Sequence, residues 1–327
     1  MTLLLYLKRS NTAWGSLVFE KNLEGFLAEI NGDFPVDKIL MDVPLSELTT
    51  YRVGGPAALF IKIEESSIFS SILRGLQKFP IPVLLLGNGS NVLISDQGFK
   101  GVVLKLGDSF ETIEIEETTV KAGASAKLPV TARETVKFGL RGFEWAVGVP
   151  GTIGGAVRMN AGGHGSDMAA SLIEVTVLNL INGSLSNVPA SELQLSYRHS
   201  CIKNTDLVLD ATFKLTKGDK DEGEGLLKEI VRWRRDNQPG GQNSGSVFAN
   251  PEGDSAGRLI EIAGLKGLRV GSASVSEKHA NFIQVDEDGR AEDVRKLMHL
   301  LVEKVEEVHS IRLNPETVLV GFDGDSS

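Results

Sequence analysis

The sequence has little cysteine, little histidine and no long apolar run. Cys201 is the single cysteine among 327 residues, so no internal disulfide can form and a disulfide-stabilised scaffold is excluded. No segment approaches the roughly 18 uninterrupted apolar residues that a membrane span requires. The first nine residues place their positive charges after a short apolar stretch, which is the reverse of a secretory signal. We therefore expect a cytoplasmic protein that does not enter a membrane.

Positive charge is also scarce. The chain has 34 Lys and Arg against 43 Asp and Glu, a formal net charge of −9, and an acidic chain repels a polyphosphate backbone. The five histidines form neither an H-E-x-x-H motif nor a cysteine–histidine pair at zinc spacing. We expect no general binding to nucleic acid and no metal site, and we expect the partners to be small molecules. The sequence leaves the oligomeric state open, with a monomer favoured.

What is present is the composition of a globular protein with two or three domains, with 41% hydrophobic and 24% charged residues. Short β-branched runs between Gly, Asn and Asp predict strands, and apolar residues at helical spacing predict helices. We expect strands at residues 59–63, 83–86, 102–104, 112–116, 120–122, 175–180 and 207–214, and helices at 23–30, 66–78, 129–138, 226–235 and 292–308. Because the strands cluster instead of alternating strictly with helices, the pattern predicts an α+β fold.

Two segments bear on the domain organisation. The charged, glycine-spaced run at residues 217–225 is typical of an exposed linker, so we divide the chain into 1–48, 49–217 and 218–327. In the last helix an apolar stripe is expected to face a core, and it consists of Val294, Leu297, Met298, Leu301, Val305 and Val308.

Two glycine-rich segments are candidates for ligand binding. Residues 87–91, Gly-Asn-Gly-Ser-Asn, follow an apolar run and form either a tight turn or a nest of backbone N–H groups for phosphate. They are not a dinucleotide fingerprint, because Val92 stands at the third glycine position. In residues 148–163, six of sixteen residues are glycine, which favours close approach of the backbone to a large ligand over a crowded turn between domains.

Serine motifs and a basic cluster leave alternatives open. Ser246, between Gly245 and Val247, is either a helix-capping hydroxyl or a proton donor. Ser255 matches the G-x-S-x-G elbow of serine hydrolases, with His279 downstream, but the preceding residues read as a turn, and we expect Ser255 to cap a helix that runs to Ile262. The basic cluster at residues 232–235 either stabilises the end of a helix or contacts a diphosphate.

Taken in order along the chain, these motifs resemble the UDP-N-acetylenolpyruvoylglucosamine reductase family. The resemblance covers residues 48 to 322, and the order of the segments is as specific as their content. The segments are Thr50-Tyr51-Arg52-Val53-Gly54-Gly55-Pro56-Ala57, residues 87–91 and 150–165, Leu195-Ser196-Tyr197-Arg198-His199-Ser200, Gly245-Ser246-Val247-Phe248, residues 256–261, 264–267 and 275–282, and Leu313-Asn314-Pro315-Glu316.

The resemblance implies a fold and a cofactor. Residues 49–217 would form a two-lobed FAD-binding domain of the vanillyl-alcohol-oxidase (PCMH) type, with residues 1–48 packing on it. Residues 218–327 would form a C-terminal α+β domain that binds the substrate. Because only a short stretch separates Phe213 from Ile230, the chain is similar to the shorter, second type of the family.

The resemblance also implies an activity, which is the NADPH-driven reduction of the enolpyruvyl ether of UDP-N-acetylglucosamine to UDP-N-acetylmuramate during peptidoglycan synthesis. NADPH and the substrate would enter the same cleft in turn. Arg198 and Glu316 would stabilise charge on the substrate carboxylate, with Glu316 protonated, and Ser246 would deliver a proton. The residues carried over for FAD are Tyr51, Arg52, Gly54, Gly55, Gly87, Asn88, Gly89, Ser90, Asn91, Gly151, Thr152, Ile153, Gly154 and Gly155.

Three other functions compete with this one. The first is another FAD-dependent oxidoreductase of the same fold, which would not need Arg198, Ser246 and Glu316 together. The second is a serine hydrolase built on Ser255, and the third is a protein that binds a UDP-sugar without reacting with it.

Overall fold

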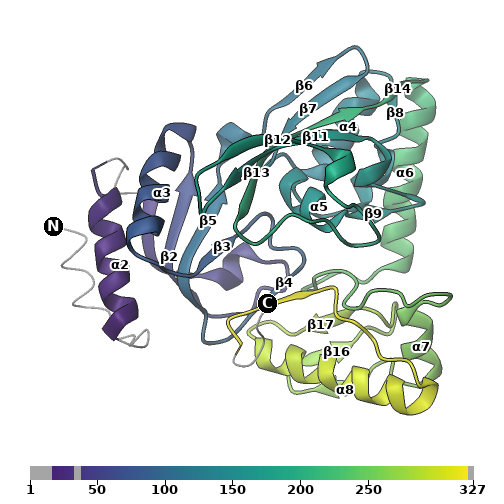
Figure 1. The fold of residues 1–327 in the computed structure, drawn as a ribbon. Helices are drawn as coiled ribbons and strands as arrows, with labels where there is room; N and C mark the ends of the chain where they lie inside the picture. Colours follow the sequence, from purple (N-terminus) through teal and green to yellow (C-terminus); the bar gives the residue numbers. More distant parts are fainter. Residues whose placement is uncertain (1–16, 33–37, 323–327) are drawn as a thin grey trace.

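The computed structural model describes residues 17–32 and 38–322, and its α+β architecture has a two-lobed body with a separate C-terminal unit (Figure 1). The apolar run at residues 3–7 lies outside the described residues. Within the described ranges, no helix is both long enough and apolar enough to span a bilayer.

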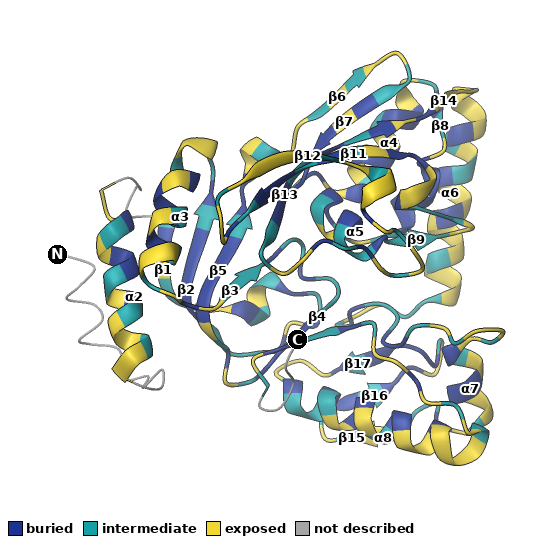
Figure 2. Ribbon diagram, in the orientation of Figure 1, coloured by how far each residue is buried: buried dark blue, intermediate teal, exposed yellow. Residues whose placement is uncertain are grey.

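The first lobe is a sheet in the order β1-β2-β5-β3, with α2 and α3 packed together at its side (Figure 1). β2 and β5 read as nearly continuous apolar runs because both of their faces are buried (Figure 2). The strand β1 is antiparallel to β2, whereas β5 runs parallel to both β2 and β3. The elements are α2 (Leu17–Ile30), β1 (Ile39–Pro44), β2 (Pro56–Ile63), α3 (Phe69–Lys78), β3 (Val83–Leu85) and β5 (Phe99–Leu106).

The second lobe is an antiparallel sheet in the order β12-β11-β13-β7-β6. Helix α5 packs on β13, and one continuous core joins this lobe to the first. The elements are β6 (Ile113–Glu116), β7 (Thr119–Gly123), α4 (Leu128–Lys137), α5 (Ile153–Met159), β11 (Leu172–Asn179), β12 (Leu185–Pro189) and β13 (Asp206–Lys214), with the short strands β8 (Leu140–Arg141), β9 (Gly162–Gly163), β10 (Ser166–Asp167) and β14 (Thr216–Lys217).

The linker predicted at residues 217–225 is wrong, because helix α6 (Lys220–Asn237) begins inside it. The Asp219 side chain accepts a hydrogen bond from the Glu222 N–H at 2.9 Å and so caps the helix. A Cβ on Gly223 would lie 2.8 Å from Val136, so this glycine lets α6 pack closely on α4. The acidic residues that suggested a solvated connector are the favourable charges of a helix N-terminus. The domain division at residue 217 stays a prediction.

The C-terminal unit packs α7 (Ala256–Ile262) and α8 (Ala291–His309) against β15 (Arg269–Val270), β16 (Ala273–Val275) and β17 (Ile283–Val285). In the predicted stripe of α8, the residues from Val294 to Val305 are buried, as expected, but Val308 is 57% exposed. The reason is its position in the last turn, beyond the edge of the core.

Two long-range contacts attach this unit to the first lobe. β18 (Val318–Val320) returns to pair in parallel with β4 (Val92–Ile94), which places the end of the described chain beside the first lobe (Figure 1). The Asp96 carboxylate, just after β4, accepts hydrogen bonds from the N–H groups of Ala291 at 2.8 Å and Glu292 at 3.1 Å. A carboxylate from one unit therefore caps the long helix of the other, which stabilises their relative placement.

Candidate active site

Two adjoining cavities lie between the two lobes and the C-terminal unit. The lobe cavity, of about 560 Å³, lies between the two sheets, where Lys62 and Lys105 of the first lobe approach Leu207 and Val208 of the second. The interdomain cavity, of about 390 Å³, extends from there to the C-terminal unit. The two cavities share lining residues at Leu85, Leu86, Gly87, Asn88, Thr152, Gly155 and Arg158, so they form one continuous cleft.

The interdomain cavity brings together the three residues expected to be catalytic, although they lie up to 118 positions apart in the sequence: Arg198, Ser246 and Glu316. The Arg198 Nε lies 2.7 Å from the Glu316 Oε1, and an Arg198 Nη2 group donates to the Gly162 carbonyl at 3.1 Å. Arg198 has a left-handed backbone, with φ of 57°. For a residue other than glycine this conformation is uncommon, and it aims the guanidinium into the cavity.

The Glu316 carboxyl group is largely buried in the interdomain cavity, beside the Arg198 guanidinium. Burial raises the pKa of Glu316, and the nearby Arg198 opposes that rise without cancelling it. Its backbone is fixed from two sides, because the Glu316 N–H donates to the Val247 carbonyl at 2.8 Å and the Asn91 side-chain amide donates to the Glu316 carbonyl at 3.0 Å. These two hydrogen bonds fix the backbone from which the Glu316 side chain enters the cavity lining.

Ser246 lies on a loop that is held rigidly on its C-terminal side. The Asn281 side chain accepts from the Phe248 N–H at 3.0 Å and donates to the Phe248 carbonyl at 2.8 Å, and the buried Val247 donates to the Asn281 carbonyl. Among the described residues, the Ser246 hydroxyl has no hydrogen-bond partner, and it is partly exposed to the cavity. A hydroxyl so placed is available to a ligand. Asn281 thus has a structural role in this loop.

The two glycine-rich segments meet at the junction of the cavities. Gly89, with φ of 62°, has no room for a side chain, because a Cβ would collide with the Leu48 carbonyl. A Cβ on Gly87 would lie 2.7 Å from the Thr152 hydroxyl, so the segments approach each other closely only because Gly87 lacks one. Of the residues expected to bind FAD, the following line the cleft: Arg52, Gly87, Asn88, Gly89, Ser90, Asn91, Gly151, Thr152, Gly154 and Gly155.

Four residues expected at the cofactor line neither cavity. Tyr51 is fully buried in the core of the C-terminal unit, and burial raises its pKa to about 12. Gly54 and Gly55 pack against the strand end at Ile94 and the Asp96 carbonyl, where a Cβ would clash. Ile153 is fully buried below the glycine segment. These positions serve packing, and a direct contact of theirs with the cofactor stays a prediction.

The serine and basic motifs lie largely outside the cleft. Ser255 caps α7, as expected, because its hydroxyl accepts a hydrogen bond from the Arg258 N–H at 3.2 Å. Ser255 lines neither cavity. From the basic cluster at residues 232–235, only Arg234 lines the interdomain cavity. Burial lowers the pKa of Arg234. Among the described residues, no group of three or more His, Cys, Asp and Glu could hold a metal ion.

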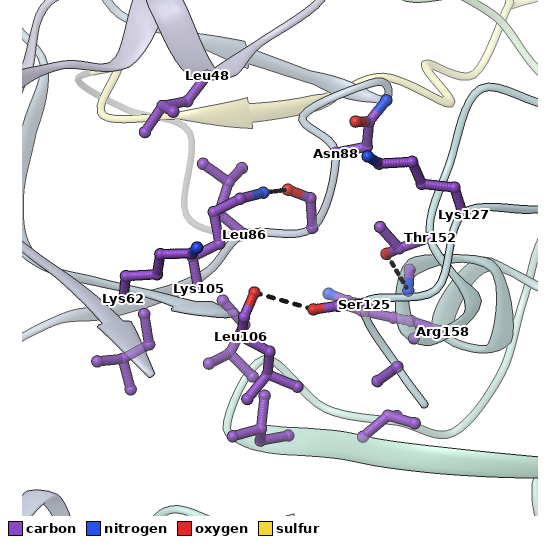
Figure 3. Close-up of a pocket in the computed structure, with 18 of the residues that line it drawn as sticks. Leu48, Lys62, Leu86, Asn88, Lys105, Leu106, Ser125, Lys127, Thr152 and Arg158 are labelled. Carbon is purple, nitrogen blue, oxygen red and sulfur yellow. Dashed lines mark hydrogen bonds between the residues drawn. The ribbon is translucent and has the colours of Figure 1, made fainter. Parts of the chain in front are cut away.

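The sequence reasoning missed the cations of the lobe cavity. Lys62, Lys105, Lys127 and Arg158 line it together with Arg52 (Figure 3). Lys105 comes from β5, where a lysine between two buried leucines was the available signal, whereas the convergence of the others depends on the tertiary fold. Their charge suits an anionic ligand.

The cleft fits FAD on two further grounds. The hydroxyl oxygens of Thr49 and Thr50 are buried without a hydrogen-bond partner and belong to residues that line the lobe cavity, so a polar ligand can satisfy them. The glycine segments let backbone N–H groups approach a diphosphate. Residues 57–188 match the family described as FAD binding domain. The cleft and this match together define an FAD-binding protein.

The relatives define the class further. Residues 237–320 match the family described as UDP-N-acetylenolpyruvoylglucosamine reductase, C-terminal domain. The chain is 42% identical to a reductase of that name from Synechococcus and 40% identical to reductase 2 of Symbiobacterium thermophilum, covering 86% of this chain and 93% and 91% of those proteins. The crystal structure of the reductase (MurB) from Thermus caldophilus superposes with a TM-score of 0.74 at 35% identity, over 86% of this chain and 98% of that one. The chain belongs to the UDP-N-acetylenolpyruvoylglucosamine reductase family, and FAD is its cofactor.

Proposed function

We propose that this protein reduces the enolpyruvyl ether of UDP-N-acetylglucosamine to UDP-N-acetylmuramate, with NADPH as the electron source, as a step of peptidoglycan precursor synthesis. The observation that carries the proposal is the convergence of Arg198, Glu316 and Ser246 on one cavity that adjoins the FAD-binding segments. The relatives are named UDP-N-acetylenolpyruvoylglucosamine reductases, and these names support the same reaction.

The substrate contains a C=C bond conjugated to a carboxylate, so adding hydride to the terminal carbon drives negative charge into that carboxylate. FAD, when bound, supplies the hydride. Arg198 stabilises the developing charge as a fixed cation, and Glu316 does so as a neutral acid that donates a hydrogen bond. The burial that raises the pKa of Glu316 favours the protonated form that this role requires.

Ser246 completes the reduction by giving its hydroxyl proton to the carbon next to the carboxylate. A serine hydroxyl is a weak acid, so this step needs a strongly basic carbon and close positioning. The clamp between Asn281 and Phe248 holds the serine loop in place, and the absence of another partner within the described chain leaves the hydroxyl free for the substrate.

NADPH and the substrate take turns in the interdomain cavity, which gives ping-pong kinetics. Arg234 also lines this cavity. Its guanidinium is suited to bind a diphosphate, a group that both NADPH and the substrate contain.

The test is an absorbance spectrum of the purified protein, followed by anaerobic addition of NADPH and then of UDP-N-acetylenolpyruvoylglucosamine. We expect flavin bands that bleach with NADPH and return with the substrate. Bands that bleach but return only with a different acceptor would show another oxidoreductase of the same fold. A protein that binds the UDP-sugar without any spectral change after NADPH would refute the proposal.

A further inference from the structure

Lys105 has an unusual setting for a lysine. It lies on β5 between the buried Leu104 and Leu106, is itself partly buried, and lines the lobe cavity (Figure 3). Its ammonium group donates a hydrogen bond to the Gly87 carbonyl, at the first residue of the glycine segment 87–91. The charge is therefore held at the edge of the cofactor-binding segment.

Among the described residues, no carboxylate lies within ion-pair distance of the Lys105 ammonium group. Lys62, on the same cavity, has two carboxylate partners, Glu64 at 2.8 Å and Asp108 at 2.9 Å, and Lys127 lies 3.7 Å from Glu111. Lys105 has no such ion-pair partner, and the charges that act on it are two lysines, Lys62 and Lys127, and one carboxylate, Glu111, which opposes them. Burial, together with these two lysines, lowers the pKa of Lys105.

An unpaired cation in such a place costs stability, because a partly buried charge loses hydration and gains repulsion without an opposing ion. The cost is recovered if a ligand brings a negative charge to the cavity. FAD carries its negative charge on the diphosphate, and the flavin ring system itself is neutral when oxidised.

We propose that Lys105 is a cofactor-binding residue whose ammonium group pairs with the phosphate oxygens of FAD, and that it makes the cavity selective for phosphorylated flavins over riboflavin. This inference rests on FAD binding and does not depend on which substrate is reduced. The hydrogen bond to Gly87 fixes the ammonium beside the backbone that approaches the same phosphates.

The test compares flavin binding by the full-length apoprotein and by two variants, followed by quenching of flavin fluorescence. Lys105→Gln keeps a donor for the Gly87 carbonyl and removes the charge, whereas Lys105→Arg keeps the charge. We expect Lys105→Gln to weaken FAD binding by about 10- to 100-fold, the range for a charged hydrogen bond, and riboflavin binding by less than about threefold. Lys105→Arg should bind FAD within about fivefold of the parent protein.

The matched control is Lys121→Gln, because Lys121 has a carboxylate partner, Asp210 at 3.5 Å, and lines neither cavity. Its FAD affinity should change by less than about threefold. A second readout is thermal stability without flavin. The Lys105→Gln apoprotein should melt no lower than the parent apoprotein, since an unbalanced charge is gone, while its increase in melting temperature on adding FAD should be smaller.

Two results would overturn the inference. Equal weakening of FAD and riboflavin, with a lower melting temperature of the apoprotein, would mean that Lys105 only supports the glycine segment. Unchanged FAD binding by Lys105→Gln would mean that no phosphate lies there. Neither result concerns turnover of the UDP-sugar, so failure of this inference is distinct from failure of the proposed reaction.

Discussion

The lobe cavity and the interdomain cavity hold their partly buried charges in different ways. In the interdomain cavity the Arg198 guanidinium lies 2.7 Å from the Glu316 carboxyl, so the protein itself supplies a partner for this cation. In the lobe cavity Lys105 has no carboxylate partner among the described residues and lies near two other lysines. A cavity that keeps one ligand can leave the balancing charge to that ligand. A cavity that releases its ligands in every cycle needs its own balance.

The largest expected effect is that of Ser246→Ala on substrate reduction, and it would distinguish the chemistry of the interdomain cavity from that of the lobe cavity. Ser246→Ala removes the proton donor of the interdomain cavity and leaves the lobe cavity untouched, so reduction of the substrate should slow by about 10²- to 10⁴-fold. Reduction of the flavin by NADPH should be retained. Rapid mixing under anaerobic conditions measures the two half-reactions separately. Equal loss of both would contradict the role given to Ser246.

A change in the Arg198–Glu316 pair should have a smaller effect on the rate of substrate reduction, and it should change how that rate depends on pH. Glu316→Gln keeps a hydrogen-bond donor but cannot titrate, and we expect a loss of about tenfold in substrate reduction. In the parent protein the rate should fall as the pH rises through the raised pKa of Glu316, because the protonated form is the active one. This decline should be absent from the pH profile of Glu316→Gln.

The same shift has a consequence for stability. Because the folded protein holds the Glu316 proton more tightly than the unfolded chain, raising the pH through this range should lower the free energy of unfolding of the parent relative to Glu316→Gln. Urea unfolding at several pH values measures the difference. If the parent protein instead becomes more stable than Glu316→Gln as the pH rises, Glu316 is stabilised as an anion by Arg198.

Asn91 sharpens the comparison, because it belongs to the glycine segment by sequence and to Glu316 by contact. We expect Asn91→Ala to lower the kcat of substrate reduction by about 5- to 10-fold, the effect of one hydrogen bond on the placement of Glu316, and to shift the alkaline limb of the pH profile. Because the Asn91 side chain bonds to Glu316, its expected contact with FAD is made by its backbone, so FAD affinity, measured by fluorescence, should change by less than about threefold. A large loss of FAD affinity with an unchanged pH profile would instead place Asn91 at the cofactor.

The smallest effect is expected outside both cavities. Ser255→Ala removes the cap of α7 and should cost about 1 kcal/mol of unfolding free energy, measured by urea denaturation. Both half-reactions should keep their parent rates, since Ser255 lines neither cavity. Loss of activity without loss of stability would reopen the hydrolase interpretation.

Much of the fold could be predicted from local patterns. The strands predicted at residues 59–63, 102–104 and 207–214 are confirmed as parts of β2, β5 and β13, because their apolar runs are rich in β-branched residues. The short strands β15 to β18 were not predicted, since strands of two or three residues have too little pattern to detect. The start of helix α6 was predicted too late, at residue 226, because Gly223 and Gly225 are typical of loops. The sequence does not show that Gly223 packs against Val136 of α4.

The site could be predicted in part. Arg198, Ser246 and Glu316 were named from motifs, and the structure brings them to one cavity. Tyr51 and Gly54 lie in equally specific motifs and yet pack inside, because a motif does not reveal whether a residue faces the ligand or supports the segment that does.

By itself, the sequence determined the class of fold, the glycine segments and the family, because these follow from composition, from short-range spacing and from motifs in order. Only the tertiary structure decided which charges are balanced. Whether Lys105 has a carboxylate partner depends on strands that are far apart in the chain, and the placement of Glu316 depends on Asn91, 225 residues away. Electrostatic interactions act through space, so their partners are set by packing and not by sequence distance.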